Sequence, residues 1–110
     1  MTDKIVVLSA CASPEEAEKI ARALVEKKLA ACVNILPAVR SIYRWKNAIE
    51  DEQETLLLIK SSRALFNELR SEIERLHSYE VPEAIAIPIV DGLDRYLEWM
   101  AGVLKEEQDS

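Results

Sequence analysis

Four consecutive apolar residues, Leu56–Ile59, constrain the fold of this chain more than any other segment. Successive side chains of a β-strand point to opposite faces of a sheet, so a strand that is apolar at every position is expected to be buried on both faces. A chain of 110 residues has material for only one helical layer, which covers one face. We therefore expect a sheet whose second face packs against another subunit.

Strand-like and helix-like patterns alternate along the chain in the order β-α-β-β-α-β, followed by a short helix. Apolar and β-branched runs predict four strands, at residues 4–10, 31–45, 52–60 and 84–90. Apolar residues at helical spacing predict helices after Ser13, after Ser62 and after Gly92. This order is that of an α+β, ferredoxin-like sandwich, in which two helices cover one face of a four-stranded sheet.

Local signals predict where these elements begin and end. Ser13 is expected to cap the first helix, with Pro14 as its first residue and Glu16 completing a capping box. Ser62 is expected to cap the second helix. Two prolines fall inside predicted strands and indicate a bulge or a sheet edge: Pro37 and Pro88.

The second and third strands predict a long central hairpin with its tip at residues 46–48. A two-stranded ribbon is marginally stable by itself, so this hairpin is a natural arm for contact with a partner subunit. Residues 105–110 are polar and predict a C-terminal tail.

Composition excludes several classes of protein. The chain has 14 Lys and Arg against 20 Asp and Glu, for a net charge of −6, which argues against nucleic-acid binding. With two glycines, it cannot form a glycine-rich phosphate loop. Its length predicts one domain over residues 1–110.

We expect no membrane association and a cytoplasmic location. No apolar run approaches the roughly 20 residues of a membrane span. Residues 8–11 look like the end of a lipoprotein signal, but the apolar run before them is too short for a secretory segment. Two cysteines, too few for a disulfide framework, indicate a reducing compartment.

His77 is the only histidine, and Glu80 and Glu83 follow it in the same predicted loop. Imidazole nitrogen and carboxylate oxygen are both ligands of transition metals. The spacing matches no recognised zinc pattern, and a firm site needs three protein ligands. A histidine just past a helix also commonly caps the last carbonyls, so a structural and a metal-binding role both stay open.

The two cysteines offer a second kind of metal ligand, since thiolates bind copper and zinc. Cys11 ends the first predicted strand just ahead of a helix N-terminus, a position that can lower the pKa of a thiol. Cys32 has apolar neighbours, as expected of a small buried side chain.

A ligand cleft is the other candidate site. Lys60 ends an apolar strand and can meet an anion, although a solvated lysine is the simpler interpretation. The acidic run over residues 50–54 is expected to be a solvated face, with loose binding of divalent ions as the alternative. Amphipathic aromatic residues can line such a cleft or lie at a subunit interface: Tyr43, Trp45, Tyr79 and Trp99.

No pattern in the chain predicts catalysis. The single histidine would have to serve every serine or cysteine, and no flanking motif singles out a partner. Nothing selects two of the 20 acidic residues as a hydrolytic pair. We expect a binding protein that is not an enzyme and has no obligatory cofactor.

Five segments in register resemble the CutA divalent-cation tolerance family. Their order and intervals match the family over nearly the whole chain, and the segments are Ala30–Ile35, Ser41–Trp45, Leu58–Lys60, His77–Glu83 and Tyr96–Trp99. The resemblance implies a ferredoxin-like subunit in a tight homotrimer, similar in structure to the PII signal-transduction proteins. It also implies binding of copper or other divalent ions, and no established catalytic activity.

Carried over by position, His77 matches the family's loop histidine and Glu83 the glutamate after Pro82. These are the family's candidate copper ligands, together with a cysteine near the end of the first strand. Some members have that cysteine at the position of Ser9, whereas this chain has Cys11. The resemblance thus implies a copper or zinc site of His77, Glu83 and Cys11.

The PII likeness implies an alternative function. In that alternative the protein is a signalling or scaffold trimer that binds an anion or small metabolite in clefts between subunits. The residues expected at such a cleft are Cys32, Tyr43, Trp45, Lys60, Tyr79 and Trp99.

Overall fold

The computed structural model describes residues 2–105, so residues 106–110 of the predicted tail lie outside it. The elements follow the predicted order, with a 3₁₀ turn at Arg63–Leu65. They are β1 (Lys4–Cys11), α1 (Pro14–Glu26), β2 (Cys32–Trp45), β3 (Ala48–Ser62), α2 (Phe66–Leu76), β4 (Ile85–Pro88) and α3 (Asp94–Val103).

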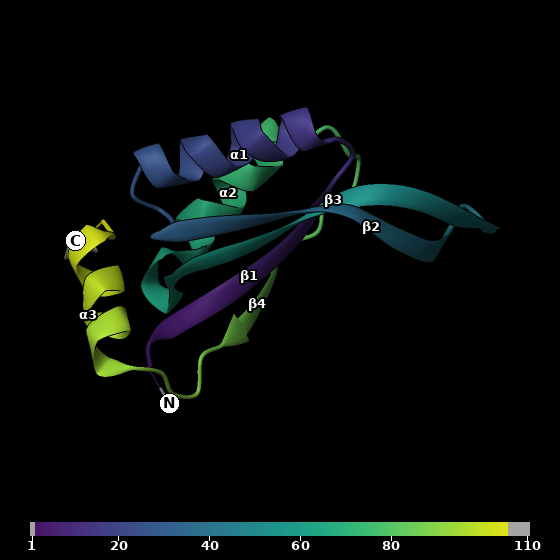
Figure 1. The fold of residues 1–110 in the computed structure, drawn as a ribbon. Helices are drawn as coiled ribbons and strands as arrows, with labels where there is room; N and C mark the ends of the chain where they lie inside the picture. Colours follow the sequence, from purple (N-terminus) through teal and green to yellow (C-terminus); the bar gives the residue numbers. More distant parts are fainter. Residues whose placement is uncertain (1, 106–110) are drawn as a thin grey trace.

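The strands form one antiparallel sheet in the order β2-β3-β1-β4. Helices α1 and α2 lie on one face of this sheet and α3 lies at one end (Figure 1). This arrangement confirms the expected ferredoxin-like fold. β4 pairs with β1 alone and ends at Pro88, which confirms that this proline belongs to a sheet edge.

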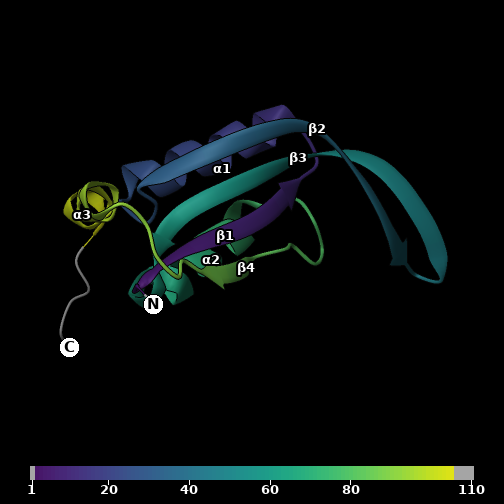
Figure 2. The same cartoon turned by 60° about the horizontal axis from the view of Figure 1, so that its bottom comes forward.

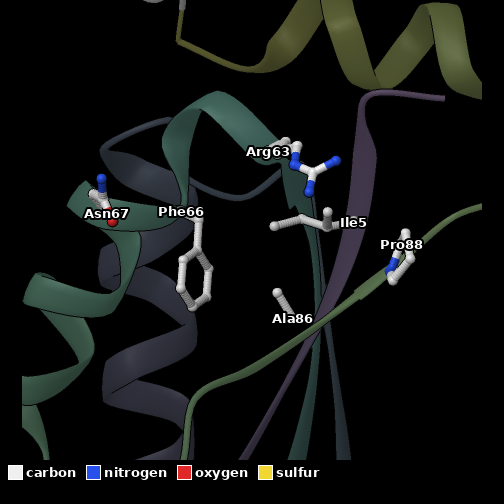
Figure 3. Close-up of a pocket in the computed structure, with 6 residues that line it drawn as sticks. All are labelled: Ile5, Arg63, Phe66, Asn67, Ala86 and Pro88. Atoms are coloured by element: carbon white, nitrogen blue, oxygen red, sulfur yellow. The ribbon is translucent and has the colours of Figure 1, made fainter.

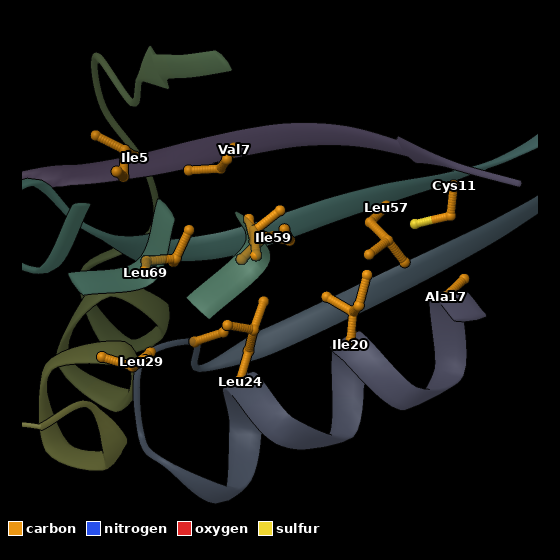
Figure 4. Close-up of a cluster of buried hydrophobic side chains, with 12 residues drawn as sticks. Ile5, Val7, Cys11, Ala17, Ile20, Leu24, Leu29, Leu57, Ile59 and Leu69 are labelled. Carbon is orange, nitrogen blue, oxygen red and sulfur yellow. The ribbon is translucent and has the colours of Figure 1, made fainter. Parts of the chain in front are cut away.

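The core lies between the sheet and the two helices. Alternate residues of β1 and β3 point into it, including Val7 from β1 and Leu57 and Ile59 from β3. They pack against the apolar stripe of α1, which includes Ile20 and Leu24 (Figure 4). All five side chains are fully buried, which is the packing that the helical and strand periodicities predict.

The opposite face of the sheet, called here the open face, carries no helix from residues 2–105 (Figure 2). Leu56 and Leu58 point to it and are only half-buried, whereas Leu57 and Ile59 are fully buried. The strand register places further apolar residues on the same face: Val6, Leu8, Ala10, Leu36, Ile85 and Ile87. A single chain therefore completes only one of the two buried faces expected for residues 56–59.

The β2–β3 hairpin extends beyond the helical layer and contributes to the elongated dimensions of 44 × 28 × 23 Å (Figure 2). A register shift between Leu36 and Val39 confirms the bulge predicted at Pro37. The tip is a two-residue turn, Lys46–Asn47, with positive φ at both residues. β3 starts directly after it, so this strand is longer and the tip shorter than predicted.

The structure confirms the predicted N-cap of α1 but not that of α2. The Ser13 hydroxyl accepts the backbone N–H of Glu16 at 3.2 Å, which confirms the predicted N-cap. The Glu16 carboxylate was expected to return to the cap, but it is turned toward residues 77–78. The prediction that Ser62 caps α2 is wrong, because Ser62 stays paired with Lys4 in the sheet and a 3₁₀ turn leads into the helix.

Candidate metal-binding site

Three side chains that can bind a metal ion converge at one end of the core. One ligand atom each of Cys11, Glu16 and His77 lies within 4.8 Å of the other two. Cys11 is the last residue of β1, Glu16 is in the first turn of α1, and His77 directly follows α2. Because α1 begins three residues after β1 ends, its first turn necessarily lies next to Cys11.

The imidazole of His77 is fully buried and engaged at both ring nitrogens. Its Nε2 lies 2.8 Å from the carbonyl oxygen of Ala10 and donates to it. Its Nδ1 accepts the backbone N–H of Tyr79 at 3.1 Å and lies 3.3 Å from a carboxylate oxygen of Glu16. This pattern fits a neutral imidazole with its proton on Nε2.

Cys11 is buried, and its thiol is a weak acid. Burial and, to a smaller extent, the negative charges of Glu16, Glu54 and Glu83 together raise its pKa to about 12. The sequence position, ahead of a helix N-terminus, suggested a lowered pKa, and the structure shows the opposite. A metal ion that binds this sulfur must therefore displace its proton.

The structure places Glu16, and not Glu83, in this cluster of described residues. Glu83 lies close enough to raise the pKa of Cys11 but forms part of the wall of a groove on the open face. The sequence pattern predicts only a helix-capping role for Glu16. The signal that could have found it is its position in the first helical turn, directly after the strand that ends at Cys11.

The groove on the open face has a volume of about 950 Å³ and is lined by three of the predicted cleft residues, Tyr43, Trp45 and Tyr79. The Tyr79 hydroxyl donates to the nearly buried Glu54 carboxylate at 2.6 Å. Burial and this carboxylate raise the pKa of Tyr79. The acidic side chains that line the groove favour cations over anions, and they are Glu50, Glu52, Glu54, Glu80 and Glu83.

The other predicted cleft residues lie elsewhere. The ammonium of Lys60 lies 4.0 Å from the Cys32 sulfur and donates to the side chain of Asn34. Trp99 packs against Tyr96 on α3, with ring centroids 5.5 Å apart. Within one chain the predicted cleft residues are therefore divided among three places.

A second, smaller hollow lies between the start of α2 and the edge strand β4 (Figure 3). Its volume is about 360 Å³, and Phe66 and Pro88 form opposite walls. It contains none of the residues predicted to bind a metal ion or another ligand. In residues 2–105 no helix has the length and apolar character that crossing a bilayer requires.

The chemistry of the three converging donors suits a transition metal. Thiolate sulfur, imidazole nitrogen and carboxylate oxygen are all zinc ligands, and the first two also suit copper. Three protein ligands leave one position of a tetrahedral ion open, as in zinc sites that exchange their fourth ligand. The residues present therefore fit a divalent ion of this type.

Comparison with known proteins agrees with the fold and with the resemblance of the sequence. The CutA protein of Thermus thermophilus is 48% identical over 95 residues, which are 86% of this chain and 92% of that protein. Human CutA is 44% identical over 100 residues, which are 91% of this chain but 56% of the human protein. The chain thus spans nearly all of the bacterial relative and just over half of the human one.

Solved structures extend this agreement to three dimensions. The Thermus thermophilus divalent cation tolerance protein superposes with a TM-score of 0.90 at 45% identity, over 93% of this chain and 99% of that one. CutA1 from Oryza sativa gives a TM-score of 0.92 at 38% identity, over 94% and 95% of the two chains. The family model of the CutA1 divalent ion tolerance protein matches residues 5–103. On these matches the chain belongs to the CutA divalent-cation tolerance family.

Proposed function

We propose that this protein binds a divalent metal ion, copper or zinc, and thereby contributes to tolerance of such ions. The observation that carries the proposal is the convergence of sulfur, nitrogen and carboxylate donors within 4.8 Å. The name of the relatives, divalent-cation tolerance proteins, supports the same function. In this proposal the protein is a binding protein, with no catalytic step assigned to any residue.

His77 and Cys11 are the proposed nitrogen and sulfur ligands. Two carboxylates compete for the third position. Glu16 is already 3.3 Å from His77 Nδ1, whereas Glu83 is the residue that the family resemblance implies. We favour Glu16, because binding through Glu83 would require this side chain to leave the groove wall.

The experiment is calorimetric titration of Zn(II), and then of Cu(II), into the wild type and four variants. The variants are His77→Ala, Cys11→Ala, Glu16→Gln and Glu83→Gln. We expect the first three to lose about tenfold or more in affinity, the range typical of changes at a metal site, and Glu83→Gln to stay near the wild type. Circular dichroism confirms that each variant is folded.

Glu50→Gln is the matched control, because it removes one carboxylate of the same charge from the open-face groove. A net charge of −6 attracts cations weakly at many places, and the control measures that background. Equal affinity in the wild type and His77→Ala would eliminate the assigned site. A loss in Glu83→Gln without one in Glu16→Gln would move the third ligand to Glu83.

We also propose that the functional unit is a homotrimer of one-domain chains, as the family resemblance implies. The partly exposed apolar side chains of the open face support a partner on that face. The span of the family match, residues 5–103, supports a single domain. A cytoplasmic location stays a prediction, since one relative is named a chloroplastic protein and one solved relative a periplasmic protein.

A second candidate function is the binding of an anion or small metabolite in clefts between subunits, as in a PII-like signalling or scaffold trimer. Lys60 supports it, because this cation lies on an otherwise largely apolar sheet face beside Cys32. The acidic groove around Tyr43 opposes it as an anion site. Thermal-shift screening of nucleotides and organic acids against the wild type and Lys60→Met tests it, and stabilisation of the wild type alone is the expected result.

A further inference from the structure

The proposed metal ligand His77 has no free lone pair in this structure. A neutral imidazole has one N–H and one lone pair. The N–H is on Nε2 and donates to the carbonyl oxygen of Ala10 at 2.8 Å. The lone pair on Nδ1 accepts the backbone N–H of Tyr79 at 3.1 Å. Nδ1 is also the nitrogen that faces Glu16, at 3.3 Å, and is thus the nitrogen on the side of the carboxylate ligand.

The side chain of Tyr79 is also held in place, by a contact separate from that of its backbone N–H. Its hydroxyl donates to the Glu54 carboxylate at 2.6 Å, a charge-assisted hydrogen bond with a nearly buried acceptor. Its ring also lies against the imidazole, with centroids 4.6 Å apart. The side chain of Tyr79 thus anchors its own backbone N–H over Nδ1.

We infer that Tyr79 is a positioning residue that controls the metal affinity of His77. The inference rests on the proposed function. One lone pair cannot accept the Tyr79 N–H and bind a metal ion at the same time, so the two interactions exclude each other. A stronger hydrogen bond between Tyr79 and Glu54 therefore lowers the affinity of His77 for a metal ion. By thermodynamic linkage, metal binding weakens this hydrogen bond by the same factor.

This competition connects the metal cluster to the open-face groove. Tyr79 lines the groove together with Trp45 and Tyr43. Release of the Tyr79 N–H from His77 changes the position of a side chain in the groove wall. The indole of Trp45 can report this change, provided that Trp99, which lies on α3, is removed as a second fluorophore.

The test is the Zn(II) affinity of Tyr79→Phe. This variant removes the hydrogen bond to Glu54 and keeps the ring. We expect affinity to rise about tenfold, because the backbone N–H is no longer anchored over Nδ1. Tyr43→Phe is the matched control: it removes a comparable hydroxyl–carboxylate contact, to Glu52 at 3.1 Å, in the same groove. We expect no change in its affinity.

A second measurement does not depend on the Tyr79 variant. In a Trp99→Phe background, saturation with Zn(II) is expected to shift or quench the emission of Trp45, and His77→Ala is expected to abolish this change. An unchanged affinity in Tyr79→Phe, or equal gains in Tyr79→Phe and Tyr43→Phe, overturns the inference. A Trp45 signal unaffected by bound Zn(II) overturns it as well.

The proposed metal site and the proposed role of Tyr79 are separated by the outcome of these measurements. If calorimetry detects no Zn(II) binding that depends on His77 in either the wild type or Tyr79→Phe, the proposed function fails and the inference with it. If Zn(II) binds through His77 with equal affinity in the two proteins, the proposed function stands and only the role of Tyr79 is lost.

Discussion

Two fully buried serines are expected to have opposite effects on the stability of the fold. Ser61 donates its hydroxyl to the backbone carbonyl of Leu29 at 2.7 Å. Ser9 has no hydrogen-bond partner for its hydroxyl among residues 2–105. A buried hydroxyl without a partner loses its hydration and gains nothing in exchange, whereas a paired one recovers most of that loss.

Substitution of each serine by alanine separates these effects. We expect Ser9→Ala to raise the free energy of unfolding by about 1 kcal/mol, since it removes a polar atom that was desolvated without compensation. We expect Ser61→Ala to lower it by about 1 kcal/mol or more, because the buried carbonyl of Leu29 is left unpaired. Urea unfolding of the two variants at equal protein concentration measures both. Destabilisation of similar size in the two would contradict this account.

Cys11 makes the metal-free protein less stable at alkaline pH. Its pKa of about 12 in the folded chain exceeds the ordinary value of 9.0, so the unfolded chain loses this proton first as pH rises. The contribution of the thiol to stability is therefore complete below pH 9 and decreases between pH 9 and 12. The slope is at most about 1.4 kcal/mol per pH unit.

Comparison of Cys11→Ala with the wild type isolates this contribution. The urea midpoints of both proteins at pH 8.5 and 10.5, with a chelator present, give the two slopes. We expect a smaller alkaline loss of stability in the variant. The tyrosines, whose pKa values are also raised, remain in both proteins and cancel in the difference. Identical slopes would show that the thiol is not held protonated by the fold.

At the scale of secondary-structure elements, backbone conformation determines the shape of the central hairpin. The bulge in β2 contains Pro37 and Ala38, and Ala38 has a φ of 61°. The same left-handed region occurs at Lys46 and Asn47 in the tip turn. Like those two residues, Ala38 carries a Cβ atom at a position that favours glycine, so it stores conformational energy in the bulge.

Glycine at position 38 is expected to release that energy. Ala38→Gly should raise the free energy of unfolding by up to about 1 kcal/mol, because release of the left-handed penalty of roughly 1–2 kcal/mol exceeds the roughly 0.5–1 kcal/mol cost of the added backbone freedom. Ala48→Gly is the control, because Ala48 is also exposed but begins an extended strand. There the added backbone freedom should cost roughly 0.5–1 kcal/mol. Thermal unfolding of both variants distinguishes the positions, and a loss at position 38 would show that the bulge does not strain Ala38.

At the scale of the whole molecule, the open face is the surface on which the proposed trimer depends. It combines the half-buried residues Leu56 and Leu58 with the exposed Ile85 and Ile87, which are 51% and 46% exposed. A continuous apolar sheet face of this kind is unfavourable in water and marks an interaction surface. In the proposed trimer the formal charge is −18, three times −6, so repulsion between subunits must be overcome by this apolar burial.

A charge placed on the open face tests the proposed trimer. We expect the wild type to sediment with the mass of three chains and Leu58→Lys to sediment as a monomer, because a buried ammonium without a partner is strongly unfavourable. Ser71→Lys adds the same charge to the exposed surface of α2 and should leave the mass unchanged. A trimeric Leu58→Lys protein would place the interface elsewhere.

Local signals account for most of what was predictable from the sequence. The period-2 and helical patterns, Ser13 as an N-cap, Pro37 at a bulge and Pro88 at an edge all depend on interactions within a few residues. Such interactions are the same in any fold that contains the segment. The order of the elements then leaves the ferredoxin-like arrangement as the natural way to bury their apolar faces.

The site was decided by contacts between distant segments. The sequence by itself indicated His77 and Cys11 as metal-ligand candidates, but the third member of the cluster, Glu16, depends on how the start of α1 packs against the end of α2. The raised pKa of Cys11 depends on burial and on carboxylates from three separate elements or loops. Residue type determines which chemistry is available, whereas distance and burial, which only tertiary packing sets, determine which groups can act together.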